Sequence, residues 1–537
     1  MLVFGGCCKL GKTCGRRVKI EGQRSQWATR TGFIFAAVGS AIGLGNIWRY
    51  PSVVYENGGG AFLLPYFIAL VTAGIPLLIM EYAIGNKYRA AGPGSYGGLS
   101  RRWGWLGWWQ AAVSFVIGTY YMVIIGWAIG FTFYAVGTRW GGGGSGESTQ
   151  DFFLGSFLGV SEGFWSVGGI QLNVLVFVLI AWAIVYTLLQ LGVKRGIELT
   201  SRILIPLLVV MLLAITIRGL TLPGAVQGLS ALLTPDLSAL GTPSVWVAAY
   251  GQVFFSLSLA FTVMITYASY LPRRSELSNS GFIMALANSG FEFLAALGIF
   301  SVLGFLATQQ NAAVDEVVQS GVILAFVSIP EIINQFPGGN SFFGVLFFAG
   351  LTFAGLTSAV SIFEVGIAAV SEKFNLSRAK SVNLVCGAAF VISMFYVTRG
   401  GLFYLDTVDN FINTYGLLLT AIVEVVFVAW VVRQLPQLRR HINEGSYIRL
   451  GAWWDVLLKF VTPAILIVVI GFTTVGEFSE PYEGYPISGI LVFGVGGAIF
   501  ALVVGVLLYK LGGGGDVGGA GGAGGAPQTT DNIEEEE

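Results

Sequence analysis

The chain has 537 residues and no net charge, and only 11 % of its residues are charged, against about a quarter in a soluble domain. Hydrophobic residues make up 55 % and gather in blocks of roughly twenty, the length of a helix that crosses a bilayer. These values exclude a string of soluble domains, and the lack of net positive charge argues against nucleic-acid binding. We therefore expect an all-α, multi-spanning membrane protein.

The first thirty residues, 1–30, are rich in lysine, arginine and cysteine and are predicted to be a cytoplasmic arm near anionic lipid. Within them, GCCKLGKT at Gly6 to Thr13 fits the phosphate-loop pattern G-x-x-x-x-G-K-[ST]. Nucleotide binding would also need a buried strand and an α/β domain, so an ATP-driven pump is kept only as an alternative. The apolar start is too short for a cleaved leader, and the four cysteines predict no disulfide framework.

Twelve apolar segments follow, and we predict each to be a transmembrane helix. They lie near 31–53, 61–85, 107–137, 171–190, 199–218, 246–270, 282–307, 341–371, 381–398, 410–433, 453–475 and 487–510. Lysine and arginine fall mainly in alternate connections, which predicts a plasma-membrane protein with both termini cytoplasmic. The long connections on the opposite side, 141–169, 220–243 and 309–340, are expected to form lids. The Gly-rich acidic tail, 511–537, is expected to be disordered, and its role cannot be read.

Two of these segments are predicted to break in the middle of the membrane. The first contains GSAIGLGN, Gly39 to Asn46, and the sixth contains FFSLSLAF, Phe254 to Phe261, with Ser256 and Ser258 inside an apolar run. Glycine costs about 1 kcal/mol against alanine inside a helix, and freed backbone groups persist in a membrane only beside a cavity or ligand. The alternative is that the glycines only allow tight helix packing.

Five helices separate the two breaks, which predicts a five-plus-five inverted repeat. The first repeat would occupy 31–218 and the second 246–433, joined by an extracellular connection at 219–245 and followed by two helices in 434–510. In transporters of this design, exposed carbonyls hold Na⁺ and helix N-termini receive an anionic group of the substrate.

Several strings in this order resemble the neurotransmitter:sodium symporter family, and most closely its prokaryotic amino-acid members with the LeuT-like fold. The strings are WATRTGF (27–33), GLGNIWRYP (43–51), ENGGGAFLLPY (56–66), GQVFFSLSLAF (251–261), ITYASY (265–270) and AGLTS (354–358). The resemblance extends from about Arg24 to the last span. It implies sodium-coupled import of an amino acid by alternating access.

The resemblance also implies two sodium sites made of oxygen donors, which suit a hard cation. One would use the carbonyl of Ala41, the side chains of Asn46, Ser256 and Asn288, and the carboxylate of the substrate. The other would use the carbonyls of Gly39, Ile42 and Ala354 and the hydroxyls of Thr357 and Ser358. An earlier AGLT ends at Thr352, and the later copy is chosen because serine follows its threonine. Ser256 replaces a threonine that is common in prokaryotic relatives.

For the substrate, the resemblance implies that the amides of Leu44 and Gly45 and the Tyr121 hydroxyl receive a carboxylate. The carbonyl of Phe255 and the oxygen of Ser258 would receive an ammonium. The full predicted substrate set is Ala41, Leu44, Gly45, Ile117, Tyr121, Phe255, Ser256, Ser258, Phe261, Ser358 and Ile362. Monoamine-transporting relatives carry an aspartate where Gly43 stands, so Gly43 favours an amino acid. Ala260 replaces a glycine that relatives have beside the sixth-span break, and it should slightly narrow the pocket or stiffen the hinge, which favours a small or branched aliphatic side chain.

Charged residues are predicted to form gates. Arg49 and Asp409 match the extracellular pair of the family, and Arg24 and Glu372 match the cytoplasmic pair, supported by Trp27, Ser269 and Tyr270. Alternatively, either pair is a fixed structural ion pair.

Glu292 stands where chloride-dependent relatives have a small polar residue, beside groups matching Tyr66, Gln252, Ser256 and Asn288. Its carboxylate is therefore predicted to replace chloride, and its protonation after sodium leaves would add proton antiport. The alternative is an acid buried only for packing. Glu81 and Glu424 also lie within spans, without a predicted role.

No enzymatic chemistry is expected. The only histidine, His441, lies in a predicted cytoplasmic loop, no nucleophile–base set is visible, and no organic cofactor is predicted. The partners expected are an amino acid, sodium ions and the bilayer. A non-transporting amino-acid sensor on the same fold is the other alternative.

Overall fold

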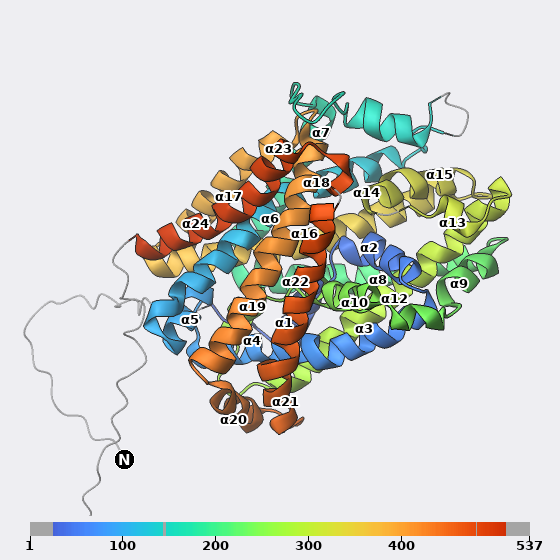
Figure 1. Ribbon diagram of the computed structural model, residues 1–537. Coiled ribbons are helices and arrows are strands. Elements are labelled where there is room, and N and C mark those ends of the chain that lie inside the picture. The colour runs from blue at the N-terminus through green and yellow to red at the C-terminus, as the bar shows by residue number, and fades with distance from the viewer. Residues whose placement is uncertain (1–24, 143–146, 320, 480, 512–537) are drawn as a thin grey trace, which may run out of the picture.

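The computed structural model describes residues 25–142, 147–319, 321–479 and 481–511. Arg24, the phosphate-loop-like string and the acidic tail lie outside the described residues. The described part is a bundle of helices whose only β pairing is two isolated bridges. Figure 1 shows α20 (Leu435–Gly445) and α21 (Ala452–Val456) at one end of this bundle and η4 (Asp151–Phe157) at the other.

The first predicted span is broken as expected. It consists of α1 (Arg30–Ala41) and α2 (Gly45–Glu56), which are bent by 56° relative to each other. Between them Ile42 is extended, with φ −70° and ψ 94°, although its N–H still donates to the Val38 carbonyl at 2.7 Å. The glycine-rich string therefore does more than allow close packing, because the chain leaves the helix there.

The sixth predicted span is also broken, into α10 (Pro243–Ser256) and α11 (Val263–Ser269). Between them Ser258, Ala260 and Thr262 have φ of 52°, 62° and 56°, the left-handed region that side chains other than glycine rarely adopt. Such a conformation persists only where the surroundings impose it. Both breaks thus lie where the sequence predicts them.

Within the described residues, nine helices are long and apolar enough to cross a membrane, or ten when α1 and α2 count as one bent span. These are Gly60–Tyr88, Arg101–Tyr134, Leu172–Leu220, Leu277–Gln310, Asn340–Phe374, Arg378–Tyr396, Gly401–Val431, Ala452–Gly484 and Ile487–Lys510. The chain is a multi-pass membrane protein, and both of the predicted helix breaks are present.

The difference from the twelve predicted spans has two physical reasons. The run Leu172–Leu220 contains two predicted spans, α7 (Leu172–Gly192) and α8 (Leu199–Leu220), joined by the π-helical η5 (Val193–Glu198). Gly192 has φ 81° and ψ −174°, so the chain leaves the helical conformation there, and α7 packs on α6 while α8 packs on α12 and α16. The sixth span divides into α10 and α11, and each of these two helices is too short to cross a membrane by itself.

The central helices hold the two breaks in place. Among the candidate spans, the most buried are those that contain α6 (Gly104–Tyr134), α12 (Leu277–Gln310) and α16 (Asn340–Phe374), and α16 packs against α1, α6 and α8. By contrast, α22 (Thr462–Ser479) and α24 (Gly496–Lys510) leave large apolar side chains exposed, as expected for helices that face lipid.

The long connections contain short helices. They are α9 (Ala225–Leu233) and η6 (Leu237–Gly241) in one, and α13 (Val314–Val317), α14 (Gly321–Ile323), η7 (Leu324–Ser328) and α15 (Ile329–Asn334) in another. The second connection reaches the interior, since Gly321 and Val322 line the central cavity. This agrees with the predicted lid.

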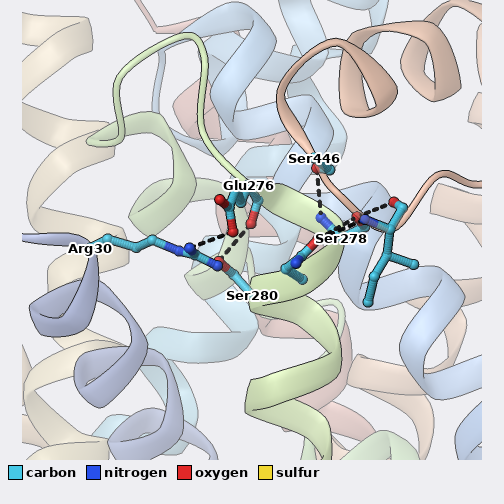
Figure 2. A network of polar contacts seen from close by, with 7 residues as sticks. Arg30, Glu276, Ser278, Ser280 and Ser446 are labelled. Atoms are coloured by element: carbon cyan, nitrogen blue, oxygen red, sulfur yellow. Dashed lines mark hydrogen bonds and ion pairs between the residues drawn. The ribbon is translucent and has the colours of Figure 1, made fainter.

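A polar network ties the start of α1 to the start of α12 (Figure 2). Arg30 forms an ion pair with Glu276, the residue before α12. Ser278 donates through its hydroxyl to the Ile448 carbonyl at 2.6 Å and through its N–H to the Ser446 hydroxyl at 3.3 Å. Three segments that are far apart in the sequence are therefore joined at one end of the bundle.

The helix α20 lies against this end of the molecule. His441 Nε2 and the side-chain oxygen of Asn86, in α4 (Ile75–Tyr88), are 2.9 Å apart. Burial, together with the nearby positive charges of Lys87 and Arg273, lowers the pKa of His441. The only histidine of the chain is thus a packing residue of a connection between spans.

Candidate substrate and sodium site

A cavity of about 170 Å³ lies where the two breaks meet α6, α16 and α18 (Gly401–Phe411). Every residue of the predicted substrate set except Ser256 lines it. The lining also includes residues that were not predicted to contact substrate, among them Ser40, Trp48, Tyr120, Ile124, Val263, Leu405, Asp406 and Asn413. The resemblance thus predicted most of the residues on the breaks, α6 and α16 that line the cavity. It did not predict the contribution of Leu405 and Asp406 from α18.

One end of the cavity has hydrogen-bond donors suited to a carboxylate. The Leu44 N–H donates to the Tyr121 hydroxyl at 3.2 Å, so two of the predicted carboxylate-binding groups are already in contact. A Cβ added to Gly43 would lie 3.1 Å from this hydroxyl, and one added to Gly45 would lie 2.5 Å from Phe255 Cε1. Both glycines are therefore needed for the close approach of the break to its neighbours.

Two serine hydroxyls that line the cavity converge on one main-chain carbonyl. The hydroxyls of Ser258 and Ser358 both donate to the carbonyl of Ser40, at 3.1 Å and 3.3 Å. Ser40 lies in the last turn of α1, where helix carbonyls lack partners within the helix. The remaining predicted lining of Ile117, Phe261 and Ile362 is apolar.

The side chains of the first predicted sodium site lie together. Asn46 Nδ2 donates to Asn288 Oδ1 at 2.9 Å and to the Ser256 hydroxyl at 3.3 Å, and Asn288 Nδ2 donates to Ser256 at 2.5 Å. Asn46 Oδ1 accepts from the Gly43 N–H at 2.9 Å. All three side chains are buried, and they come from the separate helices α2, α10 and α12.

The second predicted site lies between α1 and α16. The Thr357 hydroxyl donates to the carbonyls of Phe353 and Ala354, at 3.0 Å and 3.1 Å, and a Cβ on Gly39 would lie 3.3 Å from Thr357 Cβ. The hydroxyl of Thr352, the residue of the rejected register, donates to Phe348 at 2.8 Å. Because Thr357 faces α1, this geometry favours the later AGLT copy.

Glu292 occupies the predicted position beside the first site. Its carboxylate accepts from the Tyr66 hydroxyl at 2.5 Å and from Gln252 Nε2 at 2.7 Å, and it is fully buried. Tyr66 also contacts the Ser289 hydroxyl at 2.8 Å. Two donors, Tyr66 and Gln252, thus bond a buried carboxylate for which the described residues provide no ion-pair partner.

The predicted extracellular gate residues share the cavity without forming an ion pair among the described residues. The Arg49 guanidinium carbon lies 4.7 Å from the centroid of the Phe255 ring. Asp409 instead accepts from the Tyr120 hydroxyl at 2.5 Å and from Asn413 Nδ2 at 2.9 Å. A direct Arg49–Asp409 contact therefore requires a change of conformation.

Of the predicted cytoplasmic gate residues, Trp27 and Tyr270 are in contact, since the Trp27 N–H donates to the Tyr270 carbonyl at 3.4 Å, whereas Arg24 lies outside the described residues. Trp27 Nε1 donates to the Tyr267 carbonyl at 2.8 Å, and the Tyr270 hydroxyl donates to Glu364 at 2.8 Å. Ser269 donates to the Thr266 carbonyl. The predicted acid of this gate, Glu372, accepts from the Ala91 N–H at 2.9 Å and 3.0 Å. The Arg24–Glu372 pair stays a prediction.

Two acids without a predicted role are bound to buried polar groups. Glu81 accepts from the Ala260 N–H at 2.6 Å, in the left-handed part of the sixth break. Glu424 accepts from Gln110 Nε2 at 2.9 Å, and Gln110 accepts from the Tyr96 hydroxyl at 3.0 Å. Glu81 thus satisfies a donor that the break frees, a role that its position in an apolar span could have suggested.

Asp406 was also missed, although it precedes Asp409 by three residues and therefore lies on a neighbouring part of the same helix face. It lines the cavity and accepts from the hydroxyls of Tyr482 and Tyr485, at 3.1 Å and 3.0 Å. The cavity therefore contains two acids and one arginine at the end formed by α18.

The comparisons with known proteins agree with this geometry. A profile of the sodium:neurotransmitter symporter family matches residues 24–142 and 142–511. An uncharacterized sodium-dependent transporter of Methanocaldococcus jannaschii is 40 % identical, over 91 % of this chain and 98 % of that protein. The mouse sodium-dependent neutral amino acid transporter B(0)AT3 is 31 % identical, over 84 % of each chain.

Among solved structures, the crystal structure of MhsT in complex with L-phenylalanine matches with a TM-score of 0.71 and 31 % identity, over 83 % of this chain and 99 % of MhsT. The chain therefore belongs to the sodium:neurotransmitter symporter family, whose members couple transport to sodium.

Proposed function

We propose that this protein imports a neutral, aliphatic amino acid together with sodium, without a requirement for chloride. The observation that carries the proposal is the cavity at the two breaks, which is lined both by the predicted carboxylate-binding groups and by apolar side chains. The buried oxygen donors of Asn46, Ser256 and Asn288 lie beside the carboxylate end. A bound carboxylate would therefore complete the first sodium site.

This arrangement couples the two solutes by direct contact. Sodium needs the substrate carboxylate as a ligand, and the carboxylate needs the charge of sodium because Arg49 is the only cationic side chain among the residues that line the pocket. Sodium from outside would fill both sites and order the breaks. The broken helices would then rock against α6, α16 and their neighbours, with both termini at the cytoplasmic face of the plasma membrane.

Ala260 supports an aliphatic substrate, because it replaces the glycine expected there from the resemblance. It lies at φ 62° in the sixth break, next to the lining residue Phe261. Alanine has less conformational freedom than glycine at this φ and should stiffen the break that forms one wall of the pocket. MhsT was solved with L-phenylalanine, so aromatic amino acids are the competing class for this chain.

The test is uptake by the purified full-length protein in proteoliposomes under an inward sodium gradient, screened over the twenty amino acids. Leucine, valine or alanine should give the highest uptake, and potassium in place of sodium should abolish it. Stronger competition by tryptophan or phenylalanine than by leucine contradicts the aliphatic assignment. Binding without sodium-dependent flux would instead favour a sensor.

Chloride independence rests on Glu292, whose carboxylate supplies a fixed negative charge beside the first sodium site. Replacing chloride by gluconate on both sides of the membrane should leave the initial rate of uptake unchanged. A rate that falls to background in gluconate contradicts this part of the proposal.

A further inference from the structure

A second, larger cavity lies on the outside of the bundle. It is a groove of about 530 Å³ between α6, the α18–α19 segment, α22 and α24, where η8 (Ile412–Leu417) connects α18 to α19 (Leu418–Val426). We call it the outer groove and define it by Trp109, Tyr415, Leu419, Glu477, Leu491 and Ile499. Its walls are almost entirely apolar, and none of its residues lines the substrate cavity.

The outer groove opens toward the hydrocarbon of the bilayer. Leu491 and Ile499 are 56 % and 54 % exposed, and they lie on the last span of the chain. In a membrane-spanning protein, an exposed apolar face of a span contacts lipid chains and not water. The material that fills this groove must therefore come from the bilayer.

The groove extends across much of the membrane and has one charged end. Trp109 lies near the start of α6, whereas Glu477 lies near the end of α22, and these two helix ends belong to opposite sides in the predicted topology. Glu477 accepts from Asn410 Nδ2 at 2.9 Å, and no ion pair to Glu477 exists within the described part of the chain. The shape is that of one extended chain with a polar end.

The charge at that end distinguishes between lipids. A carboxylate at the membrane boundary attracts a cationic group and repels an anionic one. Because bulk lipid is as apolar as the groove, the hydrophobic effect does not favour one lipid over another there. Any preference of the groove for a particular lipid must come from packing and from the headgroup. We propose that the outer groove binds one hydrocarbon chain of a membrane lipid with an amine headgroup, and that Glu477 contacts the amine.

The groove shares a wall with the substrate cavity. Asp409 and Asn413 face the cavity, whereas Phe411 and Tyr415 face the groove, so opposite faces of the α18–η8 segment contact substrate cavity and lipid. Asn410, on the same segment, holds Glu477. A lipid in the groove therefore supports the helix that carries Asp409. This effect on transport rests on the proposed function, whereas lipid binding itself does not.

Lipid binding can be measured by native mass spectrometry of the full-length protein after exchange into an equal mixture of phosphatidylethanolamine and phosphatidylglycerol with identical chains. One phosphatidylethanolamine should remain bound. Ala498→Trp fills the groove and should reduce its retention about tenfold, while Val503→Trp, an exposed position of the same helix outside the groove, should not. Glu477→Gln should keep the chain bound but remove the preference for phosphatidylethanolamine, also by about tenfold.

Each alternative outcome decides against the proposal. Equal retention of phosphatidylethanolamine by Ala498→Trp and the unmodified protein overturns the site, and Ala498→Leu serves the same purpose if the tryptophan variant is not monodisperse. An unchanged preference in Glu477→Gln overturns the headgroup assignment. Cross-linking of two copies through α24 without bound lipid shows that a second chain covers the groove. If Ala498→Trp binds no lipid but takes up substrate at the wild-type rate, only the link between lipid binding and transport is overturned. If the unmodified protein binds the lipid but shows no sodium-driven uptake, the proposed function fails while the lipid site stands.

Discussion

The two predicted sodium sites are built in different ways. The first is a cluster of side chains in which Asn46, Ser256 and Asn288 bond to one another from three helices. In the second, the hydroxyls of Thr357 and Ser358 bond to main-chain carbonyls of α16 and α1. The first site thus depends on tertiary packing of side chains, whereas the second depends on two helices lying close together.

The difference predicts how the sites respond to mutation. Removing one amide from the first site leaves other buried polar groups without partners, and each such group costs about 1–3 kcal/mol. Removing the Thr357 hydroxyl from the second site leaves the carbonyls of Phe353 and Ala354, which lie inside α16 and already have partners in the helix. A substitution in the first site should therefore reduce uptake more than a substitution in the second site. Glu292, whose buried carboxylate lies beside the first site, adds to this difference.

The largest effect is expected from Asn288→Leu, which preserves volume but removes an acceptor for Asn46 and a donor to Ser256. Sodium-driven uptake should fall by at least about 100-fold, because a sodium ligand and the order of its neighbours are lost together. The measurement is uptake at saturating sodium in proteoliposomes. Asn334→Leu is the control, since Asn334 bonds Trp140 and Gly141 away from the site. Similar losses in both variants would mean general destabilisation.

The next largest effect is expected from Glu292→Ser, which removes the fixed charge beside the first site. In gluconate, uptake by the variant should fall by roughly 30-fold, because sodium then lacks a compensating negative charge in a buried site. Chloride should restore it, since the vacated space lies among the donors Tyr66 and Gln252. The experiment compares initial rates in the two anions, and a variant equally active in both would separate Glu292 from ion compensation.

A smaller effect is expected at the second site. Thr357→Val should raise the sodium concentration for half-maximal uptake about tenfold, because it removes one hydroxyl ligand. Thr352→Val is a matched control, since both threonines are buried in α16 and donate to a carbonyl of the preceding turn. The control should change this concentration by less than about twofold. The reverse pattern would show that the earlier AGLT copy forms the site.

The sequence was sufficient for the parts of the site that lie on the breaks themselves. Glycines at mid-membrane and serines in an apolar run indicated where α1 and α10 end, and the resemblance then supplied the residues next to them. Those residues are close together because they are close in the sequence or lie on one helix face.

The rest depends on contacts between distant segments. Asp406 accepts from two tyrosines that lie 76 and 79 residues further along the chain. Glu81 meets the Ala260 N–H only because the chain is left-handed at that point. The separation of Arg49 from Asp409 belongs to one conformation of the transporter. No local pattern encodes such contacts, so Asp406 was missed and Glu81 was noted without its partner.

The smallest effect is expected from adding one methyl group to Ser256, whose hydroxyl lies between the side-chain amides of Asn46 and Asn288. Ser256 accepts from both Asn46 and Asn288, so its oxygen must point into the first sodium site. Threonine keeps the hydroxyl and restricts rotation about χ1, which lowers the entropy that sodium binding must remove. Ser256→Thr should therefore lower the sodium concentration for half-maximal uptake about twofold to threefold. Because Ser256 is buried, a weaker sodium response would mean that packing against the added methyl outweighs the gain from a fixed rotamer. Either sign leaves the second site unchanged, so the response of Thr357→Val in this background should equal its response alone.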